Sequence, residues 1–555
     1  MKSMNNMKRL HAAKVMALTI AIVFFGACKD LTELNINPNG ASEEEANPNL
    51  ILPTVLTEGA KLYLNLGYQD IAGVVQHTQK DAWAEGHNDY DWGGDQSWNG
   101  YYDVLRNNDL LYKRASEEGM EFHQGVALVM RAFMFGLITD LWGDAPYTDA
   151  LRGDEDDLAY IFPAFDTQET IYTGIIGELE QANSLLSKSS SEYIGIINDA
   201  DVYYGGEPAQ WRKFANSLLL RYYMRISEKM PDVAKAGIEK IAGNPSQYPI
   251  INAAADDATM AFVGNSAVDS WPHNLQFDSE AGSNYRRLKM CATLVDHMQG
   301  LDDPRLAIWA NRVQVSLKVD ANLPAGTDKV EGNVRYLSPD KVAGVLIDQD
   351  PEYVGMPPSW SSSVPSSYNL NPTPGQLSNN PHVSFLNDIY KEASGPLLKA
   401  RLLSAAEVHF ILAEAAIKGW SVGSGQEHFN QGVKQSLEAW AVGDAYEDYI
   451  ENAGVAYEGT VEQVMEQKWI ASWTAATEAW FDYRRTGYPE LEAGPAALRS
   501  VLPVRFYYMQ DELTINRQHA DQALERLEVT GHTQADGKNS AWSKPWLLQG
   551  TGKPW

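Results

Sequence analysis

Apolar residues recur at helical spacing along much of the chain from about Leu50 onward. In residues 126–141, 403–417 and 461–480 they repeat every three or four positions, which places them on one face of a helix. Few segments alternate with a period of two, so the pattern predicts a mainly helical protein. The apolar positions are Val126, Val129, Phe133, Leu137 and Leu141 in the first segment, Leu403, Ala406, Phe410, Ala413 and Ile417 in the second, and Val461, Met465, Trp469, Trp473, Ala476 and Trp480 in the third.

The helix predicted over residues 403–417 also indicates how the helices pack. It carries many alanines, and small side chains let two helices approach closely, as tetratricopeptide-type pairs require. Lys418 and Gly419 follow it, a cation and a glycine that are typical of a helix end. The sequence shows no clean period of about 34 residues, so the helix pairing is an inference from side-chain size.

Two long stretches, 255–285 and about 320–385, have the composition of loops. The second contains Pro357-Pro358 and a run of three serines at 361–363. Loops of this length in a compact domain are usually functional or disordered. No composition shift separates two domains, so we expect residues 50–555 to form a single helical body with loop-rich insertions at these two places.

The first thirty residues predict export from the cytoplasm. Residues 1–14 are basic, and the apolar run from Val15 to Ala27 that follows is 13 residues long. A helix of that length spans roughly 20 Å, short of the roughly 30 Å hydrocarbon core of a bilayer. Residues 1–27 therefore read as a signal peptide, and no later segment reaches 18 apolar residues in a row.

The end of the signal peptide predicts a lipid anchor. Phe25-Gly26-Ala27-Cys28 resembles a bacterial lipobox, with Phe25 in place of the usual leucine, and Cys28 would become the acylated N-terminus. Lys29-Asp30 resembles part of the surface-export signal of Bacteroidota lipoproteins. The alternative is a secreted protein in which Cys28 is incidental. Residues 28–49 are rich in Asn, Pro and Glu, which is typical of a flexible tether.

Composition and charge exclude several classes of protein. The chain has 73 acidic and 44 basic residues, a net charge of -29 and a pI of about 4.7. Such a field repels a polyanion, so we expect no nucleic-acid partner. Two cysteines are too few for a disulfide scaffold or a zinc cluster built on several thiolates.

Motifs of catalysis and cofactor binding are missing from the sequence. It contains no H-E-x-x-H, no G-x-S-x-G, no phosphate-binding loop and no dinucleotide-binding turn. The segment from Asp89 to Gly100 begins like a calcium loop but has glycine at two positions that need oxygen ligands. We therefore predict no catalytic residue, no metal and no cofactor, while a glycosidase carboxylate pair among the 73 acids stays open.

Aromatic residues in loops are the candidate ligand contacts. Residues 83–102 combine several rings with glycines and with Asn and Asp side chains. Ring faces suit the C–H face of a pyranose, and the polar side chains suit its hydroxyls. The same rings could instead pack under the loop or contact a protein partner. The candidates are Trp83, Tyr90, Trp92, Trp98 and Tyr101 in this segment, together with Trp271, Tyr353 and Trp360 on the two long loops.

Six blocks of sequence, in order along the chain, resemble the SusD/RagB family of outer-membrane nutrient-binding lipoproteins, in its SusD-like branch. Each block is weak alone, and the set is specific. Pro503-Val504 stands where the family more often has Tyr-Pro. The blocks are Arg131-Ala132-Phe133 with Asp140 to Tyr147; Trp211 to Leu218 with Arg221 and Arg225-Ile226-Ser227; Asp303 to Leu306; Ala405-Ala406-Glu407 with Ala413 to Ala416 and Gly419-Trp420; Glu478-Ala479-Trp480 with Arg484 to Pro489; and Leu502-Pro503-Val504 with Glu512 and Asn516.

The charged residues of these blocks look structural. We expect ion pairs between helices from Arg131, Arg221, Arg484 and Arg485 beside Glu407, Glu414 and Glu478. The family binds its ligand through loop aromatics that vary, so no binding residue carries over by motif.

The resemblance implies a mainly α fold, in which tetratricopeptide-like helix pairs form a curved scaffold with long loops and little β structure. It implies a lipid-anchored protein on the outer membrane, exposed at the cell surface. Such a protein captures a glycan, or less readily a peptide, and passes it to a partner TonB-dependent transporter without chemistry of its own. The rival hypotheses are a secreted glycoside hydrolase or peptidase, and a surface scaffold without a small ligand.

We predict that Cys28→Ala releases the protein from the membrane fraction, because the acyl chains that Cys28 would carry are then missing. Fractionation of cells followed by immunoblotting measures this. Continued sedimentation of the variant with membranes would refute anchoring at Cys28.

Overall fold

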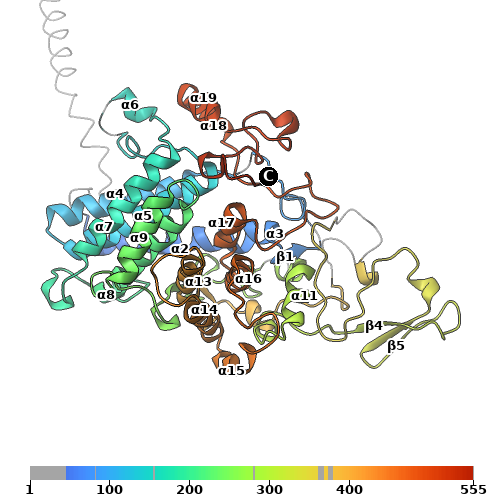
Figure 1. Ribbon diagram of the computed structural model, residues 1–555. Coiled ribbons are helices and arrows are strands. Elements are labelled where there is room, and N and C mark those ends of the chain that lie inside the picture. Colours follow the sequence, from blue (N-terminus) through green and yellow to red (C-terminus); the bar gives the residue numbers. More distant parts are fainter. Residues whose placement is uncertain are drawn as a thin grey trace, which may run out of the picture. The chain divides into compact units, whose positions relative to one another are not determined.

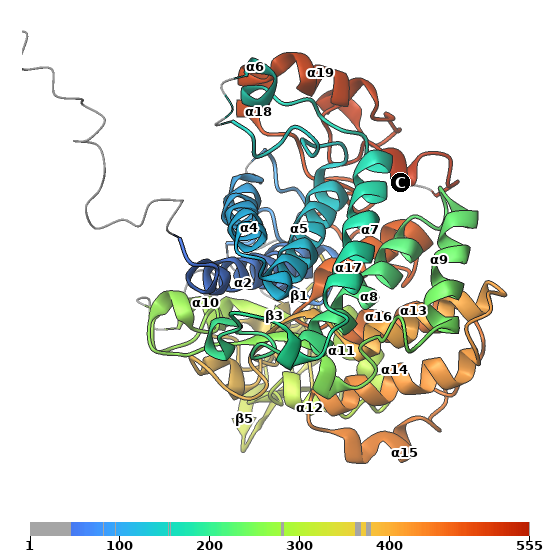
Figure 2. The same cartoon turned by 90° about the vertical axis from the view of Figure 1, so that its left-hand side faces the viewer.

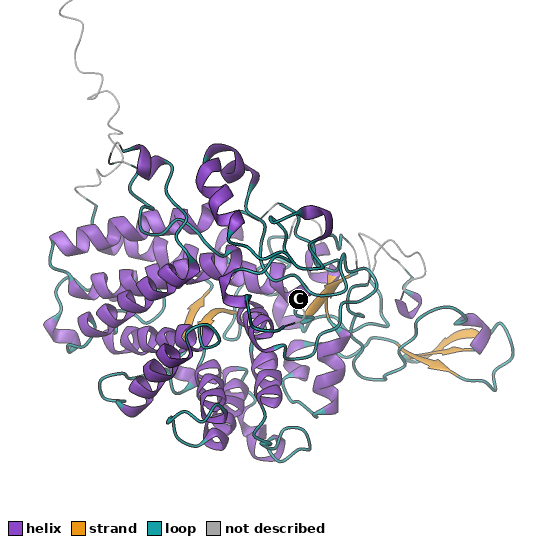
Figure 3. Ribbon diagram, turned by 45° about the horizontal axis from the view of Figure 1, so that its top comes forward, coloured by secondary structure: helices purple, strands orange, loops and turns teal. Residues whose placement is uncertain are grey.

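Helices make up most of the structure, and its strands are few and short (Figure 3). The chain divides into two units, Met1–Asn47 and Pro48–Trp555, and the second is described below. The predicted signal peptide, Cys28 and most of the predicted tether lie outside the described residues. This computed structural model describes residues 46–81, 83–94, 96–153, 155, 157–278, 282–360, 368–372, 379–553 and 555.

Successive helices pack side by side as pairs in the first half of this unit (Figures 1 and 2). Each of α4, α5, α7, α8 and α9 contacts the next, and α2 covers α4 and α5. This is the predicted tetratricopeptide-like arrangement. The bounds are α2 Pro48–Asn65, α4 Asn99–Glu117, α5 Glu121–Trp142, α7 Gln168–Leu185, α8 Pro208–Arg225 and α9 Pro231–Gly243.

A second group of helices forms the other half. Here α13 packs on α14 and α16, and α16 packs on α17. The bounds are α13 Ala405–Ile417, α14 Gly425–Ala439, α16 Val461–Ala471 and α17 Ala476–Thr486. The shorter helices are α3 Ala72–Val74, α6 Leu158–Ile161, α10 Ser283–Arg287, α11 Ala292–Gly300, α12 Leu306–Trp309, α15 Tyr446–Tyr449, α18 Gln510–Ile515 and α19 Arg517–Glu525, with a π-helical turn η2 at Leu66–Ile71.

Local sequence sets where these helices begin and end. The hydroxyl of Ser404 accepts a hydrogen bond from the Glu407 backbone at 3.2 Å, and Thr460 caps α16 in the same way. Helix α13 ends at Ile417, before the predicted stop at Lys418 and Gly419, and Gly419 has φ +78°. Leu403, which the apolar spacing placed on this helix, belongs instead to the strand before it.

The segment predicted as one apolar helix over 461–480 is two helices. α16 ends at Ala471 and α17 begins at Ala476, with Thr474 at φ +67° between them. The backbone of Ala475 and Ala476 lies against Gly67 of η2, so closely that a Cβ on Gly67 would lie 3.1 Å from the Ala476 nitrogen. The apolar spacing continues across the break because both helices face the same core.

Helix α5 lies at the centre of the core. It is the one helix among the described residues that is long and apolar enough to cross a membrane, and 94% of its most apolar window is buried inside the protein. Gly136 lets Tyr222 of α8 approach, since a Cβ at this position would clash with the phenol ring. The length of α5 therefore reflects its central position between α4, α7 and α8.

Short strands join segments far apart in the chain. β1 Thr78–Lys80 pairs antiparallel with β3 Leu288–Met290, and β2 Ala258–Ala261 pairs antiparallel with β7 Lys399–Leu403. β6 Val334–Leu337 lies between β4 Ser316–Val319, which is parallel to it, and β5 Asp328–Glu331, which is antiparallel. The three-stranded sheet lies on the side away from α4 and α5 (Figures 1 and 3). Parts of the two predicted loop regions are thus strands.

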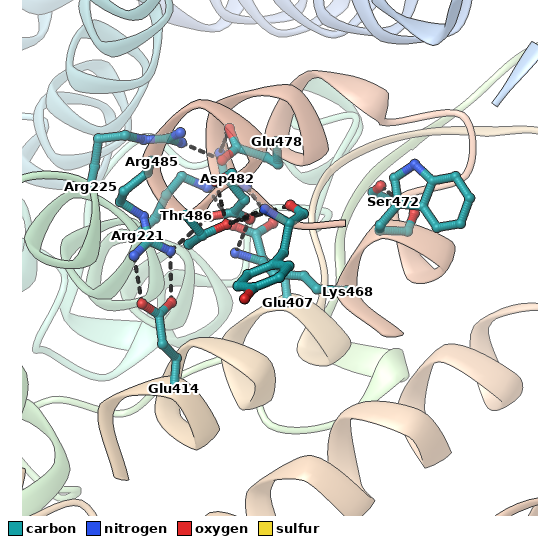
Figure 4. Close-up of polar contacts among 12 residues, drawn as sticks. Arg221, Arg225, Glu407, Glu414, Lys468, Ser472, Glu478, Asp482, Arg485 and Thr486 are labelled. Atoms are coloured by element: carbon teal, nitrogen blue, oxygen red, sulfur yellow. Dashed lines mark hydrogen bonds and ion pairs between the residues drawn. The ribbon is translucent and has the colours of Figure 1, made fainter. Parts of the chain in front are cut away.

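Buried ion pairs connect the two groups of helices (Figure 4). Arg221 of α8 donates to both carboxylate oxygens of Glu407 on α13 at 2.7 Å, and its neighbour Arg225 pairs with Glu478 of α17. Arg485 of α17 donates to both oxygens of Glu414 at 2.5 and 2.7 Å. The predicted pairing of these residues between helices is confirmed.

Two of the predicted arginines have other partners. Arg484 donates to the backbone carbonyls of Asp140 and Val504 at 2.8 and 2.6 Å, and its guanidinium lies 3.6 Å from the Asp140 carboxylate. Arg131 pairs with Glu178 of α7 at 2.9 Å. These partners come from segments that no spacing in the sequence connects with the arginines.

Pairing keeps the buried carboxylates ionised. Burial opposes the charge of Asp482, yet Lys468 at 2.7 Å and Arg485 at 3.1 Å hold its pKa down at about 2. Burial likewise opposes ionisation of Glu478, while Arg221 and Arg225 lower its pKa. Removing one partner of such a pair leaves an uncompensated buried charge, which costs far more than the pair itself contributes.

We expect Arg485→Met to lower the free energy of unfolding by about 3–5 kcal/mol, because Glu414 then stays buried without its main cation and Asp482 keeps Lys468 but loses its second cation. Chemical denaturation followed by circular dichroism measures this. Arg517→Met is the control, since Arg517 forms an exposed ion pair with Asp521 at 3.4 Å and its loss should change stability little. Equal midpoints for the two variants would contradict the structural role of the buried pairs.

Candidate functional site

Most candidate rings of residues 83–102, which we call the aromatic loop, point into the protein. Trp92 is 7% exposed and packs edge-on against Trp480 and Phe506, with ring centres 5.3 and 4.8 Å away. Trp98 is 2% exposed and contacts the ring of Trp142 at 5.7 Å. Buried rings of this kind offer no face to a ligand in this structure.

Three further candidates are also buried. Tyr90 and Trp271 have no exposed surface, and Tyr101 is 6% exposed. Trp271 lies 5.2 Å from the ring of Tyr68, and Tyr101 lies edge-on to Trp142 at 5.7 Å. These rings belong to the main hydrophobic core.

The polar residues of the loop explain how its rings become buried. Asn88 donates to the carbonyls of Lys80 at 2.7 Å and of Trp360 at 2.9 Å. Asp89 accepts from the backbone of Gly86 and of Asp91. These side chains supply hydrogen-bond partners for backbone N–H and C=O groups. Because those groups are paired, the loop can fold back onto the core. Asn88 and Asp89, two of the polar residues that suggested sugar recognition, thus form hydrogen bonds with backbone groups in and around the loop.

Trp83 is the exposed ring of this loop, with 55% of its surface accessible. The guanidinium carbon of Arg287 lies 4.0 Å from its ring centre, in a cation–π contact. The β1–β3 pairing sets this contact, since Lys80 lies opposite Leu288 and the Asp81 nitrogen donates to the Arg287 carbonyl at 3.1 Å. Trp83 therefore stands next to α10.

The other two candidates are half-buried. Trp360 packs on Tyr368, with ring centres 6.0 Å apart, and its carbonyl accepts the bond from Asn88 of the Trp83 loop. Tyr353 follows Glu352, whose carboxylate pairs with Arg312 at 3.0 Å. Trp360 is thus connected to the loop that carries Trp83, and Tyr353 follows the partner of Arg312 in the chain.

Two surface cavities lie near these residues, and we name them hollow A and hollow B. Hollow B is the larger one, lies beside α10 and has a volume of about 470 Å³. This lies within the roughly 300–1,000 Å³ of small-ligand sites. Its lining combines two aromatic rings, three cations and three amides, and Asp388 supplies the carboxylate. The lining residues are Leu275, Gly282, Tyr285, Arg286, Asn311, Arg312, Gln314, Asn379, Phe385, Asp388 and Lys391.

Hollow A is a smaller cavity of about 200 Å³ on the side of the Trp83 loop. Burial raises the pKa of Asp70 in its wall to about 6, against the opposing effect of Lys80. Burial lowers the pKa of His87 to about 3, and the charge of Lys80 adds to this. The lining residues are Gln69, Asp70, Lys80, Glu85, Gly86, His87, Trp92 and Gln96.

A buried lysine lies beneath the aromatic wall of hollow B. The Lys289 ammonium has no exposed surface, stands 3.2 Å from the centre of the Phe385 ring, and has no hydrogen-bond partner among the described residues. Burial lowers its pKa to about 7, and Asp81 opposes that shift. Phe385 in turn stacks on Tyr285, with ring centres 6.4 Å apart.

The ion-pair network encloses a third cavity of about 30 Å³, lined by Lys468, Glu407, Glu478 and Ser472 among others (Figure 4). It has room for about one water molecule and none for a sugar. Within the described ranges no group of three or more His, Cys, Asp or Glu side chains is placed to hold a metal ion.

Comparison with known proteins gives a consistent result. Residues 42–332 and 350–509 match a family model, SusD-like, described as starch-binding and associating with the outer membrane. A search of curated protein sequences gives no match.

Solved structures share the fold. An outer membrane protein of Bacteroides vulgatus, whose description connects it with nutrient binding, is 25% identical with a TM-score of 0.69, and the alignment covers 91% of this chain and 100% of that one. A chitin-binding protein is 22% identical with a TM-score of 0.68, over 90% and 99% of the two chains. A SusD homologue from Bacteroides fragilis is 21% identical with a TM-score of 0.66, over 91% and 99%.

We expect Trp98→Ala to lower the free energy of unfolding by about 3–5 kcal/mol, because it empties a large site in the core. Trp83→Ala should leave stability nearly unchanged, since that ring is mostly exposed. Thermal unfolding of the two variants compares them directly. Equal melting temperatures would contradict the contrast in burial between the two rings.

Proposed function

The chain belongs to the SusD-like family of starch-binding proteins that associate with the outer membrane, and on this premise we propose that it captures an oligosaccharide at the cell surface. It then delivers the captured nutrient to a partner TonB-dependent transporter in the outer membrane. The observation that carries the proposal is the exposed ring of Trp83, which contacts Arg287 of α10, the helix whose residues Tyr285 and Arg286 line hollow B.

The chemistry of this surface suits a sugar. Trp83 is held by Arg287 and by the strand pairing, so its ring needs no reordering to stack on a pyranose face. The amides of Asn311 and Gln314 in hollow B can both donate to and accept from sugar hydroxyls. A solved relative of the same fold is described as chitin-binding, which supports a glycan over a peptide.

Trp83 is the ring that we propose contacts the ligand, with Trp360 and Tyr353 at the edges of the surface. Tyr90, Trp92, Trp98, Tyr101 and Trp271 would need to leave the core before they could stack on a sugar. We therefore assign these five rings to packing.

The rest of the proposal concerns delivery. Signal peptide 1–27, an acylated Cys28 and a tether over residues 28–49 would hold the body at the outer face of the outer membrane, within reach of a transporter. Isolation of the tagged protein from outer membranes in mild detergent tests the partnership. A TonB-dependent barrel that copurifies in stoichiometric amount is the expected result, and its absence would contradict this part of the proposal.

A glycoside hydrolase is the second candidate, because Asp70 and Glu85 share hollow A and the pKa of Asp70 is raised to about 6. Incubation of the protein with oligosaccharides, followed by chromatography of the products, separates the two functions. Turnover that Asp70→Asn abolishes would establish the hydrolase instead of the binding protein.

We predict that Trp83→Ala weakens oligosaccharide binding at least tenfold, because a single well-placed aromatic ring contributes about 1.4 kcal/mol or more at such a site. Isothermal titration calorimetry against a panel of defined oligosaccharides measures the dissociation constants. Tyr160→Ala is the matched control, since Tyr160 lies on α6 and also packs under an arginine, with the Arg152 guanidinium carbon 3.7 Å from its ring centre. Unchanged affinity in Trp83→Ala would remove this ring from the site.

A further inference from the structure

Hollow A, next to the loop that carries Trp83, and hollow B, next to α10, carry opposite charge in a protein that is strongly acidic as a whole. Hollow A contains Asp70 and Glu85 against Lys80. Hollow B contains Arg286, Arg312 and Lys391 against Asp388. A concentration of cations in one cavity stands out from a chain with a net charge of -29.

Two cations of hollow B, Lys391 and Arg312, keep capacity for a further partner. Lys391 pairs with Asp388 at 2.8 Å and Arg312 with Glu352 at 3.0 Å, and both are partly exposed pairs that water screens strongly. Arg312 uses one terminal nitrogen in this pair, whereas a guanidinium has five N–H donors in a planar fork. A ligand anion can therefore bind without first breaking a strong internal interaction.

The buried Lys289 lies behind the aromatic wall of hollow B. Its ammonium lies against Phe385, whose ring lines the cavity and stacks on Tyr285. Lys391 approaches the ring of Tyr285, with its ammonium 5.4 Å from the ring centre. The two aromatic rings thus lie near lysine side chains, and among the described residues Asp388 supplies the one carboxylate that lines the cavity.

Resting on the proposed function, we propose that hollow B binds the anionic substituent of an acidic glycan, a sugar carboxylate or a sulfate ester, while Trp83 stacks on a neighbouring residue of the same glycan. The planar fork of Arg312 matches either anion with two parallel N–H···O bonds. Asn311 and Gln314 take hydroxyls beside the charged group.

The acidic remainder of the protein does not prevent this binding. At physiological ionic strength the Debye length is about 8 Å, so distant surface carboxylates are screened while the cations that line the cavity act at contact. The ligand class therefore follows from the local charge and not from the net charge of the chain.

Calorimetry with matched ligands tests the inference. An α-glucan, a β-glucan and a galactan oligosaccharide are each used in three forms, namely neutral, oxidised at C6 to the uronate, and carrying sulfate esters. For the backbone that binds best, we expect one acidic form to bind at least tenfold more tightly than the neutral form. Comparison of the uronate form with the sulfated form shows which anion the cavity binds.

Variants of the cations in hollow B test whether the anionic group of the glycan binds in this cavity. Arg312→Gln combined with Lys391→Gln should weaken binding of the acidic form at least tenfold and reduce the acidic-to-neutral selectivity to about onefold. Arg106→Gln is the control, because Arg106 forms an exposed ion pair with Asp103 on α4. If the double variant does not fold, each single variant should still lower the selectivity severalfold.

The failures of the two proposals are distinguishable. A neutral oligosaccharide that binds as tightly as its acidic forms, and in a Trp83-dependent way, overturns the inference and leaves the proposed function standing. Selectivity for the acidic form that survives in the variants of hollow B also overturns it. Binding of no oligosaccharide in any form overturns both proposals.

Discussion

The buried ion pairs between α8, α13, α16 and α17 are the constraint on which the arrangement of the helices depends. A charge in the core is tolerated only opposite a partner of the other sign, so Arg221 and Glu407, or Arg485 and Glu414, fix the register of one helix against another. Sliding α8 or α17 along α13 would separate each arginine from its carboxylate and leave both charges buried without a partner.

Short strands and turns connect the helices that carry these ion pairs with the candidate site. Arg221 also donates to the carbonyl of Leu402 at 2.7 Å, which ties β7 to α8. At the other end, the turn between α16 and α17 packs on η2, whose chain leads into β1. β1 then pairs with β3 and brings Trp83 next to Arg287. The exposed ring is therefore positioned by a rigid frame, although it lies on a loop.

The site itself divides aromatic residues into two groups with different work. Buried rings such as Trp92 and Trp98 join the loop to the core, and Trp83 is the ring for which we propose a ligand contact. In that proposal the ring is already held in place, so that little conformational entropy is lost when a ligand binds. In the further inference, the cations of hollow B add a chemical preference to a ring that by itself accepts many sugars.

The sequence by itself determined the helical class and the C-terminal end of α13, because these depend on residues close together in the chain. Its ordered blocks determined the family and pointed to the charged residues, Arg221 and Arg485 among them, that pair between helices. The break between α16 and α17, the strand pairings and the partners of Arg131 and Arg484 were decided only by the tertiary structure. The same holds for the fate of each ring in the aromatic loop. Trp92 is buried because Trp480 and Phe506, which are far away in the sequence, cover it, whereas 55% of the surface of Trp83 stays accessible. Burial is a property of both surfaces in a contact, and the local sequence contains only one of them.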